Sequence, residues 1–385
     1  MQNTIVDILN EYKSYLIENR LSDKKDSINI LLMISQIDEY CNDDILYEYF
    51  LQSCRDLKRD MENGKTPYPV GMIGGLGQYI FSINEFRKKT GSLIGFNREL
   101  HLYYSEYAKN VLKFHAGYKK NAYLNYDVIS GAAGILYYLV ENRDIVENDE
   151  AILYFIGYLS DVRLYVQTNN GDCLVNFGLA HGLAGILTSL CKAYSKGYRL
   201  KNQLKKINAL FGIYEKFQTT KNGITYFPSI LSSEEFNKDG FVIRQEEKAY
   251  TWCYGSITIL RTLIKSYNYM GNKPMADYYT GLLIDNLSKS VANNKLVVPI
   301  ICHGYSSVIN IVKSSLCGDC LKKSGVENYF INKIIDEIKN ETIKKYLYVR
   351  FKNDISFLQG FGGVILTLSR YAQNEISFDK LLLID

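Results

Sequence analysis

Proline is scarce in this chain of 385 residues, with only five present. Because proline breaks helices, its scarcity beside long periodic segments favours a helical fold. No apolar run reaches 18 residues, which argues against a membrane-spanning helix. Histidine occurs only four times, so the neighbouring pair Cys302–His303 is an unusual feature. The formal charge of +4 is too small to indicate a nucleic-acid-binding protein.

A secretory signal is also missing from the first residues, MQNTIVDILNEYKSYLIENR, which lack a basic segment followed by an apolar run. The chain nevertheless has eight cysteines. Without an export signal, these cysteines predict a protein of the reducing cytoplasm, where thiols are buried, metal-bound or catalytic rather than joined in disulfides.

A glycine followed by an apolar run recurs six times, at intervals of 49 to 73 residues. The marker glycines are Gly74, Gly131, Gly182, Gly255, Gly304 and Gly360. The runs after them are apolar nearly all round, which predicts buried helices, whereas the segments between them are amphipathic. We therefore predict an all-α fold with two concentric layers, an α/α toroid of helical hairpins, with an open helical solenoid as the alternative. We expect the glycines to let helix starts crowd around the central axis.

One interval is longer than the others and contains residues 222–247, which are broken up by Gly, Pro, Ser and Asn. The stretches ITYF (224–227) and FVIR (241–244) are typical of short strands. We predict a small β-containing insertion near 220–247 within a single toroid domain spanning 1–385.

The repeat places three metal-ligating side chains at equivalent positions. Cys253 lies two residues before Gly255, and Cys302 and His303 directly precede Gly304. If all marker glycines lie at one end of the ring, these side chains converge. Two thiols and an imidazole are good zinc ligands, and three protein ligands leave one position open, as in catalytic sites. The alternative is that the cysteines are simply buried.

Two further residues could form an acid/base pair near this group. His181 directly precedes Gly182, and Asp127 precedes Gly131 by four residues. Together they could transfer protons; alternatively, His181 is a core histidine and Asp127 a helix cap. The pair Cys317 and Cys320 forms a C-x-x-C, but no second pair lies nearby, so we interpret these cysteines as incidental.

The stretches YDVISGAAGILYYL, NFGLAHGLAGIL, WCYG, ICHG and SFLQGFGGVIL occur in this order. With them, the chain resembles the lanthionine synthetase C-like family of class I lanthipeptide cyclases, from about residue 70 to 370. The resemblance implies an α/α toroid with one catalytic zinc ion held by Cys253, Cys302 and His303. It also implies proton transfer by His181 and Asp127, with Tyr254 beside the metal.

The same resemblance implies an activity and its partners. Family members of this type add a cysteine thiol of a precursor peptide to dehydroalanine or dehydrobutyrine, which closes a lanthionine or methyllanthionine ring. The expected partners are the dehydrated precursor with its leader, a dehydratase and an ABC transporter. The expected location is the cytoplasm, in a complex peripheral to the inner face of the cell membrane. Nucleic acid is not an expected partner.

The chain departs from the family pattern at three places. SITIL follows WCYG where Pro-Gly is usual, and YSSVI follows CHG where Ala-Gly is usual. The family's arginine before the tryptophan is also missing, and Ala249 stands there instead. Lys248 or Arg244 could replace its charge but not its geometry. Alternative functions are the addition of glutathione to dehydrated proteins and a scaffold without catalysis; a prenyltransferase subunit fits less well because its zinc set includes a carboxylate.

Overall fold

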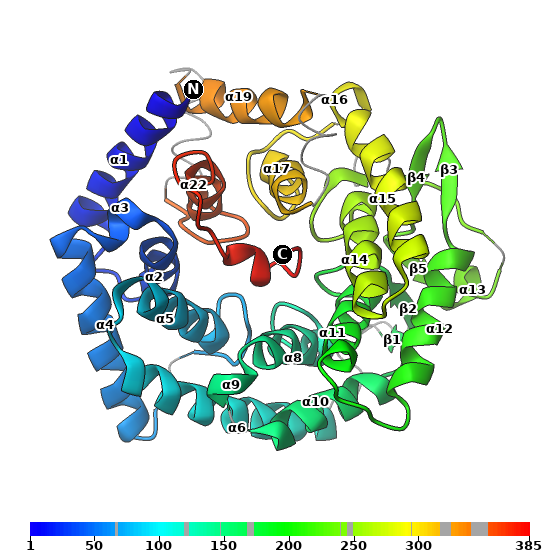
Figure 1. The fold of residues 1–385 in the computed structure, drawn as a ribbon, viewed down its shortest axis with the longest axis horizontal. Coiled ribbons are helices and arrows are strands. Elements are labelled where there is room, and N and C mark those ends of the chain that lie inside the picture. The colour runs from blue at the N-terminus through cyan, green and yellow to red at the C-terminus, as the bar shows by residue number, and fades with distance from the viewer. Residues whose placement is uncertain are drawn as a thin grey trace.

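Helices account for most of the chain, and the computed structural model arranges them in two concentric rings (Figure 1). The structure describes residues 1–65, 68–118, 123–146, 148–167, 173–238, 240–244, 249–293, 295–315, 325–339 and 353–385. The inner ring consists of α2 (Ser27–Gln36), α5 (Leu76–Thr90), α8 (Ala132–Glu141), α11 (Leu183–Ser195), α14 (Ser256–Tyr269), α17 (Tyr305–Ser314) and α22 (Phe361–Ser369). The outer ring consists of α1 (Gln2–Asn19), α4 (Asp44–Glu62), α6 (Ile94–Tyr118), α10 (Asp149–Asp161), α12 (Gln203–Lys216), α15 (Lys273–Ser288) and α19 (Val326–Lys339).

The burial of each helix follows its apolar pattern. Every residue from Leu183 to Ala193 of the inner helix α11 is buried. The outer helix α4 buries only the stripe Leu46, Phe50, Cys54 and Leu57, whose spacing of three or four residues defines one helical face. The predicted layers of fully buried and half-buried helices are thus confirmed.

The ring is closed, which confirms the toroid and excludes the open solenoid. Helix α22 packs against α2, and α1 packs against α22 as well. The side chain of Asn29 in α2 accepts hydrogen bonds from Gln78 Nε2 at 3.1 Å and from the Phe357 amide at 3.2 Å. Helix α2 therefore joins the first and the last of the glycine-marked units. No glycine precedes α2, so the repeat pattern missed this inner helix.

The marker glycines other than Gly74 have a different function from the one expected. A Cβ atom at Gly304 would lie 2.1 Å from the carbonyl oxygen of Val298, and one at Gly255 would lie 2.1 Å from that of Thr251. Each glycine therefore lets its own loop fold back against the start of the helix. Close approach between neighbouring loops occurs instead at Gly178, where a Cβ would lie 2.3 Å from the carbonyl oxygen of Cys253.

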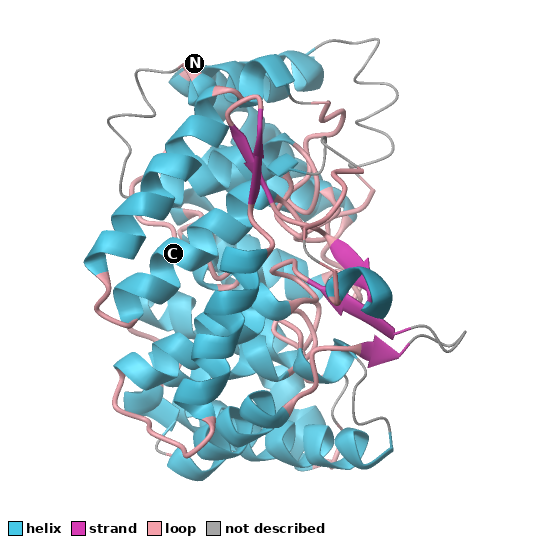
Figure 2. Ribbon diagram, turned by 90° about the vertical axis from the view of Figure 1, so that its right-hand side faces the viewer, coloured by secondary structure: helices cyan, strands magenta, loops and turns pink. Residues whose placement is uncertain are grey.

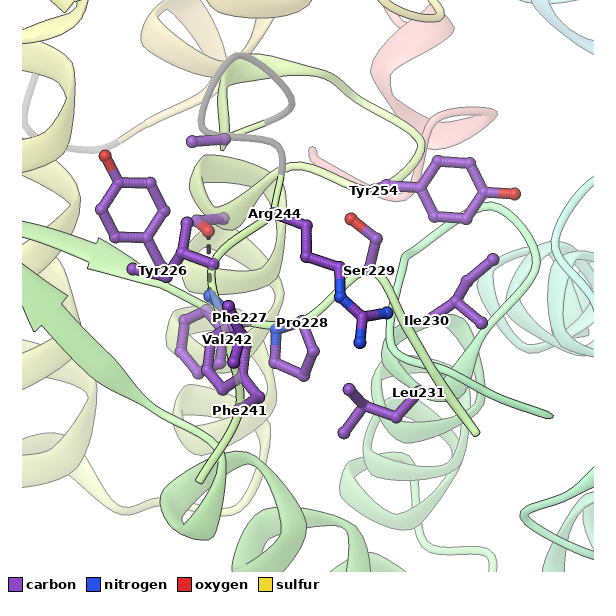
Figure 3. Close-up of a pocket in the computed structure, with 13 residues that line it drawn as sticks. Tyr226, Phe227, Pro228, Ser229, Ile230, Leu231, Phe241, Val242, Arg244 and Tyr254 are labelled. Carbon is purple, nitrogen blue, oxygen red and sulfur yellow. Dashed lines mark hydrogen bonds between the residues drawn. The ribbon is translucent and has the colours of Figure 1, made fainter. Parts of the chain in front are cut away.

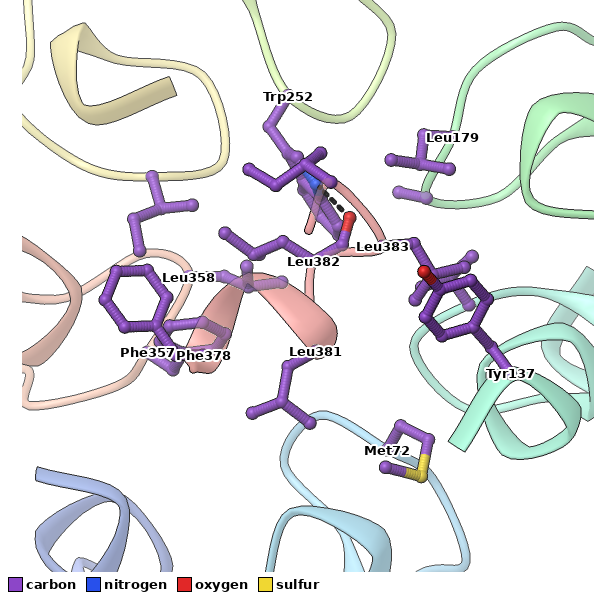
Figure 4. Close-up of a cluster of buried hydrophobic side chains, with 14 of the residues drawn as sticks. Met72, Tyr137, Leu179, Trp252, Phe357, Leu358, Phe378, Leu381, Leu382 and Leu383 are labelled. Atoms are coloured by element: carbon purple, nitrogen blue, oxygen red, sulfur yellow. Dashed lines mark hydrogen bonds between the residues drawn. The ribbon is translucent and has the colours of Figure 1, made fainter. Parts of the chain in front are cut away.

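The centre of the ring is filled by the segment that follows α22 (Figure 4). Residues Leu381 to Ile384 are at most 1% exposed, and they follow the short helix η3 (Phe378–Lys380). The indole Nε1 of Trp252 donates to the carbonyl oxygen of Leu382 at 3.0 Å. On another side, Lys265 Nζ donates to the Asp385 carboxylate at 2.8 Å. The inner ring therefore packs around a solid core in which this segment is anchored at two points.

Short strands form beside the helical wall (Figure 2). Strands β1 (Val166–Gln167), β2 (Cys173–Asn176) and β5 (Ile230–Ser232) make an antiparallel sheet in the order β1-β2-β5. Strands β3 (Thr219–Lys221) and β4 (Ile224–Tyr226) form a hairpin. The β-containing insertion is thus confirmed, and β4 lies where ITYF predicted a strand. The prediction of a strand at Phe241–Arg244 is wrong, because this segment has no regular secondary structure.

Five short helices complete the described chain: α3 (Asp38–Cys41), α7 (Tyr123–Tyr126), α9 (Arg143–Val146), α13 (Ser233–Phe236) and α16 (Ser290–Asn293). Across the described ranges, none of the helices combines the length and the apolar character that crossing a bilayer requires.

Candidate metal centre and proton-transfer pair

The loops that precede the inner helices are joined to one another by backbone hydrogen bonds. The Val128 amide donates to Ala180 O at 3.0 Å, and the Ala180 amide donates to Cys253 O at 3.3 Å. The Cys253 amide donates in turn to Cys302 O at 3.3 Å, and the Cys302 amide to Leu358 O at 2.9 Å. Loops that are far apart in sequence therefore lie side by side at one end of the ring.

Two of these joined loops bring together the three predicted metal ligands. Cys253 lies in the loop before α14, and Cys302 and His303 lie in the loop before α17. Their ligand atoms all lie within 4.8 Å of one another. Cys302 and His303 are adjacent, yet both reach the same point because they occupy a turn rather than a helix. Cys253 and Cys302 are buried and His303 is exposed, so the group is open toward solvent on one side.

The pKa values of the two thiols are shifted in opposite directions. A hydrogen bond from Cys302, supported by His303, lowers the pKa of Cys253. The same hydrogen bond, together with burial, raises the pKa of Cys302, because a second thiolate beside the first is unfavourable. A divalent cation would remove this repulsion and allow both sulfurs to ionise. The donor chemistry of the group therefore fits a zinc ion.

Ser306 and Ser307 hold the loop that carries Cys302 and His303. The Ser307 hydroxyl accepts a hydrogen bond from the Trp252 amide at 3.1 Å and donates to Ile301 O at 2.5 Å. The Ser306 hydroxyl donates to Pro299 O. These serines stand where the family resemblance led us to expect Ala-Gly. The function of these serines could not be predicted from the sequence, because a hydroxyl that links two loops leaves no regular spacing of residues.

Asp127 and His181 form a hydrogen-bonded pair near this group. Asp127 Oδ2 lies 2.7 Å from His181 Nδ1. The second oxygen, Oδ1, accepts from the amides of Ser130 at 2.7 Å and Gly131 at 2.9 Å. Asp127 is therefore both a loop acceptor and the partner of His181, so the two alternatives left open by the sequence are compatible.

The surroundings of the pair differ between its members. The Asp127 side chain is fully buried, whereas that of His181 is 26% exposed. Burial raises the pKa of Asp127, and the bonds from His181 and the two amides oppose that shift. Because Nδ1 points at the carboxylate, this nitrogen carries a proton and the imidazole has a defined orientation.

Tyr254 lies between the metal group and the pair. It follows Cys253 directly, and its ring centroid is 6.5 Å from that of His181. Gly178 makes room for it, since a Cβ there would lie 2.8 Å from Tyr254 Cδ1. One end of the toroid thus carries the three predicted metal ligands, the Asp127–His181 pair and Tyr254.

Ala249, where the resemblance led us to expect an arginine, is 4% exposed. It lines a cavity of about 250 Å³ together with Tyr254 and Arg244 (Figure 3). Arg244 forms an ion pair with Glu235. Lys248 and the pair Cys317–Cys320 lie outside the described residues.

The other two histidines are not part of the metal group. His101 is a buried core histidine whose Nδ1 bonds Asn97 O at 2.6 Å and whose Nε2 bonds the Tyr138 hydroxyl at 2.7 Å. His115 is exposed on α6.

Comparison with known proteins gives consistent results. Residues 27–383 match the family described as lanthionine synthetase C-like protein. The chain is 30% identical over 292 residues to the nisin biosynthesis protein NisC of Lactococcus lactis subsp. lactis, over 68% of this chain and 65% of that protein. It therefore spans slightly less than two thirds of the length of this relative. A solved structure of a nisin cyclase matches with a TM-score of 0.72 at 21% identity, over 99% of this chain and 97% of that one.

Proposed function

We propose that this chain, which belongs to the lanthionine synthetase C-like family, is a zinc-dependent cyclase that forms thioether rings in a dehydrated precursor peptide. The observation that carries the proposal is the convergence of Cys253, Cys302 and His303 within 4.8 Å, beside the Asp127–His181 pair. A thiol-binding metal and a proton-transfer pair are the two components that such an addition requires.

The reaction adds a substrate thiol to a carbon–carbon double bond. The thiol loses its proton, and its sulfur attacks the β-carbon of dehydroalanine or dehydrobutyrine. The new C–S bond forms as the π electrons move toward the carbonyl, which gives an enolate. A proton must then reach the α-carbon, so the addition is balanced without an oxidant or a further reactant.

Cys253, Cys302 and His303 would hold the zinc ion, with the open side toward the exposed His303. A zinc ion there would supply a Lewis acid that keeps a substrate thiol in its thiolate form at neutral pH. The two cysteine ligands are themselves thiolates when metal is bound, and they reduce the positive charge of the metal. This leaves the substrate sulfur nucleophilic.

His181 is the residue that we assign to proton transfer at the α-carbon. Asp127 accepts from Nδ1, so it fixes the orientation of the imidazole. The other nitrogen, Nε2, is then the one that exchanges a proton with the substrate. Tyr254, whose ring is 6.5 Å from that of His181, is the second group that could donate at this position.

We also infer the partners from the proposed reaction. The substrate must already contain dehydrated serine or threonine, so a dehydratase has to act first. A leader-bearing precursor peptide, the dehydratase and an ABC transporter would form a complex with this chain at the inner face of the cell membrane.

A competition between thiols tests the function. A synthetic peptide with one dehydroalanine and one cysteine is incubated with the zinc-loaded protein and excess glutathione, and free thiols are counted by alkylation and mass spectrometry. Loss of the peptide thiol without a mass increase supports a cyclase. Addition of the mass of glutathione would instead support the glutathione-adding alternative, and no reaction at all would favour a scaffold.

A further inference from the structure

The cavity of about 250 Å³ beside the metal group has walls from two segments of the insertion (Figure 3). Phe227 and Pro228 come from the stretch between β4 and β5, and Leu231 comes from β5 itself. Val242 comes from the irregular segment Phe241–Arg244. Tyr254 stands at one end, directly after the metal ligand Cys253. Tyr254 therefore borders both the cavity and the surroundings of the metal group.

Two large apolar side chains stand exposed at this cavity. Val242 is 75% exposed and Ile230 is 42% exposed, and both line it. Large apolar side chains left in water around a concave site are typical of a binding surface. Arg244 also lines the cavity, but its charge is balanced by Glu235. Among the lining residues that the structure describes, the mouth thus offers an apolar contact and a cation that is already paired.

The size of the cavity limits its occupant. A dry cavity of about 150 Å³ holds benzene, whereas sites for drug-sized ligands begin near 300 Å³. A volume of about 250 Å³ therefore suits one large aliphatic or aromatic side chain.

We propose that this cavity is a specificity subsite that receives one apolar side chain of the substrate peptide, within two residues of the reacting cysteine. The proposal rests on the proposed cyclase function. The short distance along the chain is required because Tyr254 belongs both to the cavity and to the surroundings of the metal group, and an extended peptide advances only about 3.3 Å per residue.

Competition between two peptides tests the subsite. Both contain one dehydroalanine and one cysteine, and they differ only in the residue before the cysteine, which is leucine in one and aspartate in the other. The wild-type protein should consume the thiol of the leucine peptide with a kcat/KM about 10-fold higher or more. The Val242→Asp variant should reduce this preference to about 3-fold or less, and since Val242 is 75% exposed its fold should survive.

Ile94→Asp is the matched control, because Ile94 is 64% exposed and lies at the start of α6 in the outer ring. This variant should keep the wild-type preference. Equal rates for the two peptides with wild-type protein, or an unchanged preference in Val242→Asp, would overturn the proposal.

A cross-linking experiment separates this proposal from the proposed function. The probe is the same peptide with serine in place of cysteine and p-benzoylphenylalanine before it, so that no ring can close. Cross-links at Ile230–Leu231 or Phe241–Arg244 support the subsite even if the protein never consumes a thiol. Ring closure with cross-links only elsewhere would overturn the subsite and leave the cyclase intact.

Discussion

The amide of Trp252 donates a hydrogen bond to the hydroxyl of Ser307 at 3.1 Å, and this bond joins the loops that hold Cys253 and Cys302. The same hydroxyl donates to Ile301 O at 2.5 Å. A serine outside the ligand set therefore adds a further link between the two loops that supply the ligands, beside the backbone bonds from the Trp252 and Cys253 amides to Cys302 O.

Ser307→Ala should weaken zinc binding by on the order of 10-fold, because partners that orient metal ligands typically contribute 10- to 100-fold in affinity. Competition with a chromophoric zinc chelator measures the effect. Ser369→Ala is the matched control, since the Ser369 hydroxyl is also buried but bonds Leu366 O at 2.9 Å in α22, away from the metal loops. Equal zinc affinity in Ser307→Ala and wild-type protein would show that the bridge does not position the ligands.

Asp127→Asn should reduce the rate of ring closure by on the order of 100-fold, because an amide can turn its NH2 group toward Nδ1, so that His181 loses its fixed tautomer and orientation. Bound zinc should be unchanged, which separates proton transfer from metal binding. Asp354→Asn provides the control, because Asp354 Oδ1 likewise accepts from a backbone amide, that of Ser356 at 2.9 Å, but in another loop of the ring. A full rate with Asp127→Asn would remove this pair from the mechanism.

The buried His101 should make the fold sensitive to acid. Burial lowers its pKa from 6.5 to about 4, against the bond to Asn97. As the pH falls below 6.5, the unfolded chain binds a proton that the folded chain excludes, so stability is lost progressively down to pH 4. The full loss from this one residue is about 3 kcal/mol.

Urea denaturation of wild-type protein and His101→Gln between pH 7 and 4 checks this sign. The wild type should lose stability more steeply than the variant over that range, whatever the variant's stability at pH 7. Parallel curves would show that His101 does not titrate as its burial requires.

Lys265 should be essential for anchoring the central segment. Its amine donates to Asp385 at 2.8 Å and to Leu383 O at 3.1 Å, and burial lowers its pKa to about 7. Lys265→Met leaves the Asp385 carboxylate, whose side chain is 24% exposed, and the carbonyl of buried Leu383 without this partner. It should destabilise the fold by about 2 kcal/mol in chemical denaturation. Lys273→Met, which removes an ion pair with Asp277 from a lysine 73% exposed, should change stability by less than about 0.5 kcal/mol. Similar effects in both variants would refute the anchoring function.

Repetition made much of the fold predictable from the sequence. Six glycines followed by apolar runs indicated the inner helices, and their equivalence grouped Cys253 with Cys302 and His303 across 50 residues. Helix α2 was not predicted as an inner helix because no glycine precedes it. Strands β1 and β2 were not predicted because segments of two to four residues are too short to show the alternation of apolar and polar residues that indicates a strand.

Contacts between loops could not be predicted in the same way. The bridge from Ser307 to Trp252 and the cavity beside Tyr254 depend on which surfaces meet after folding. The glycines were recognised but misinterpreted, because the close neighbours of all but Gly74 are residues of their own loops. Local sequence patterns predict the helices well, whereas the distances between helices are set by how their side chains pack.

The most direct test of the account is to titrate zinc back into chelator-treated protein and measure the rate of thiol loss from a dehydroalanine peptide. The account predicts a rate that rises in proportion to bound zinc and stops rising at one zinc ion per chain, with no recovery in Cys302→Ala. A rate that is already full without zinc, or that does not depend on bound zinc, would contradict it.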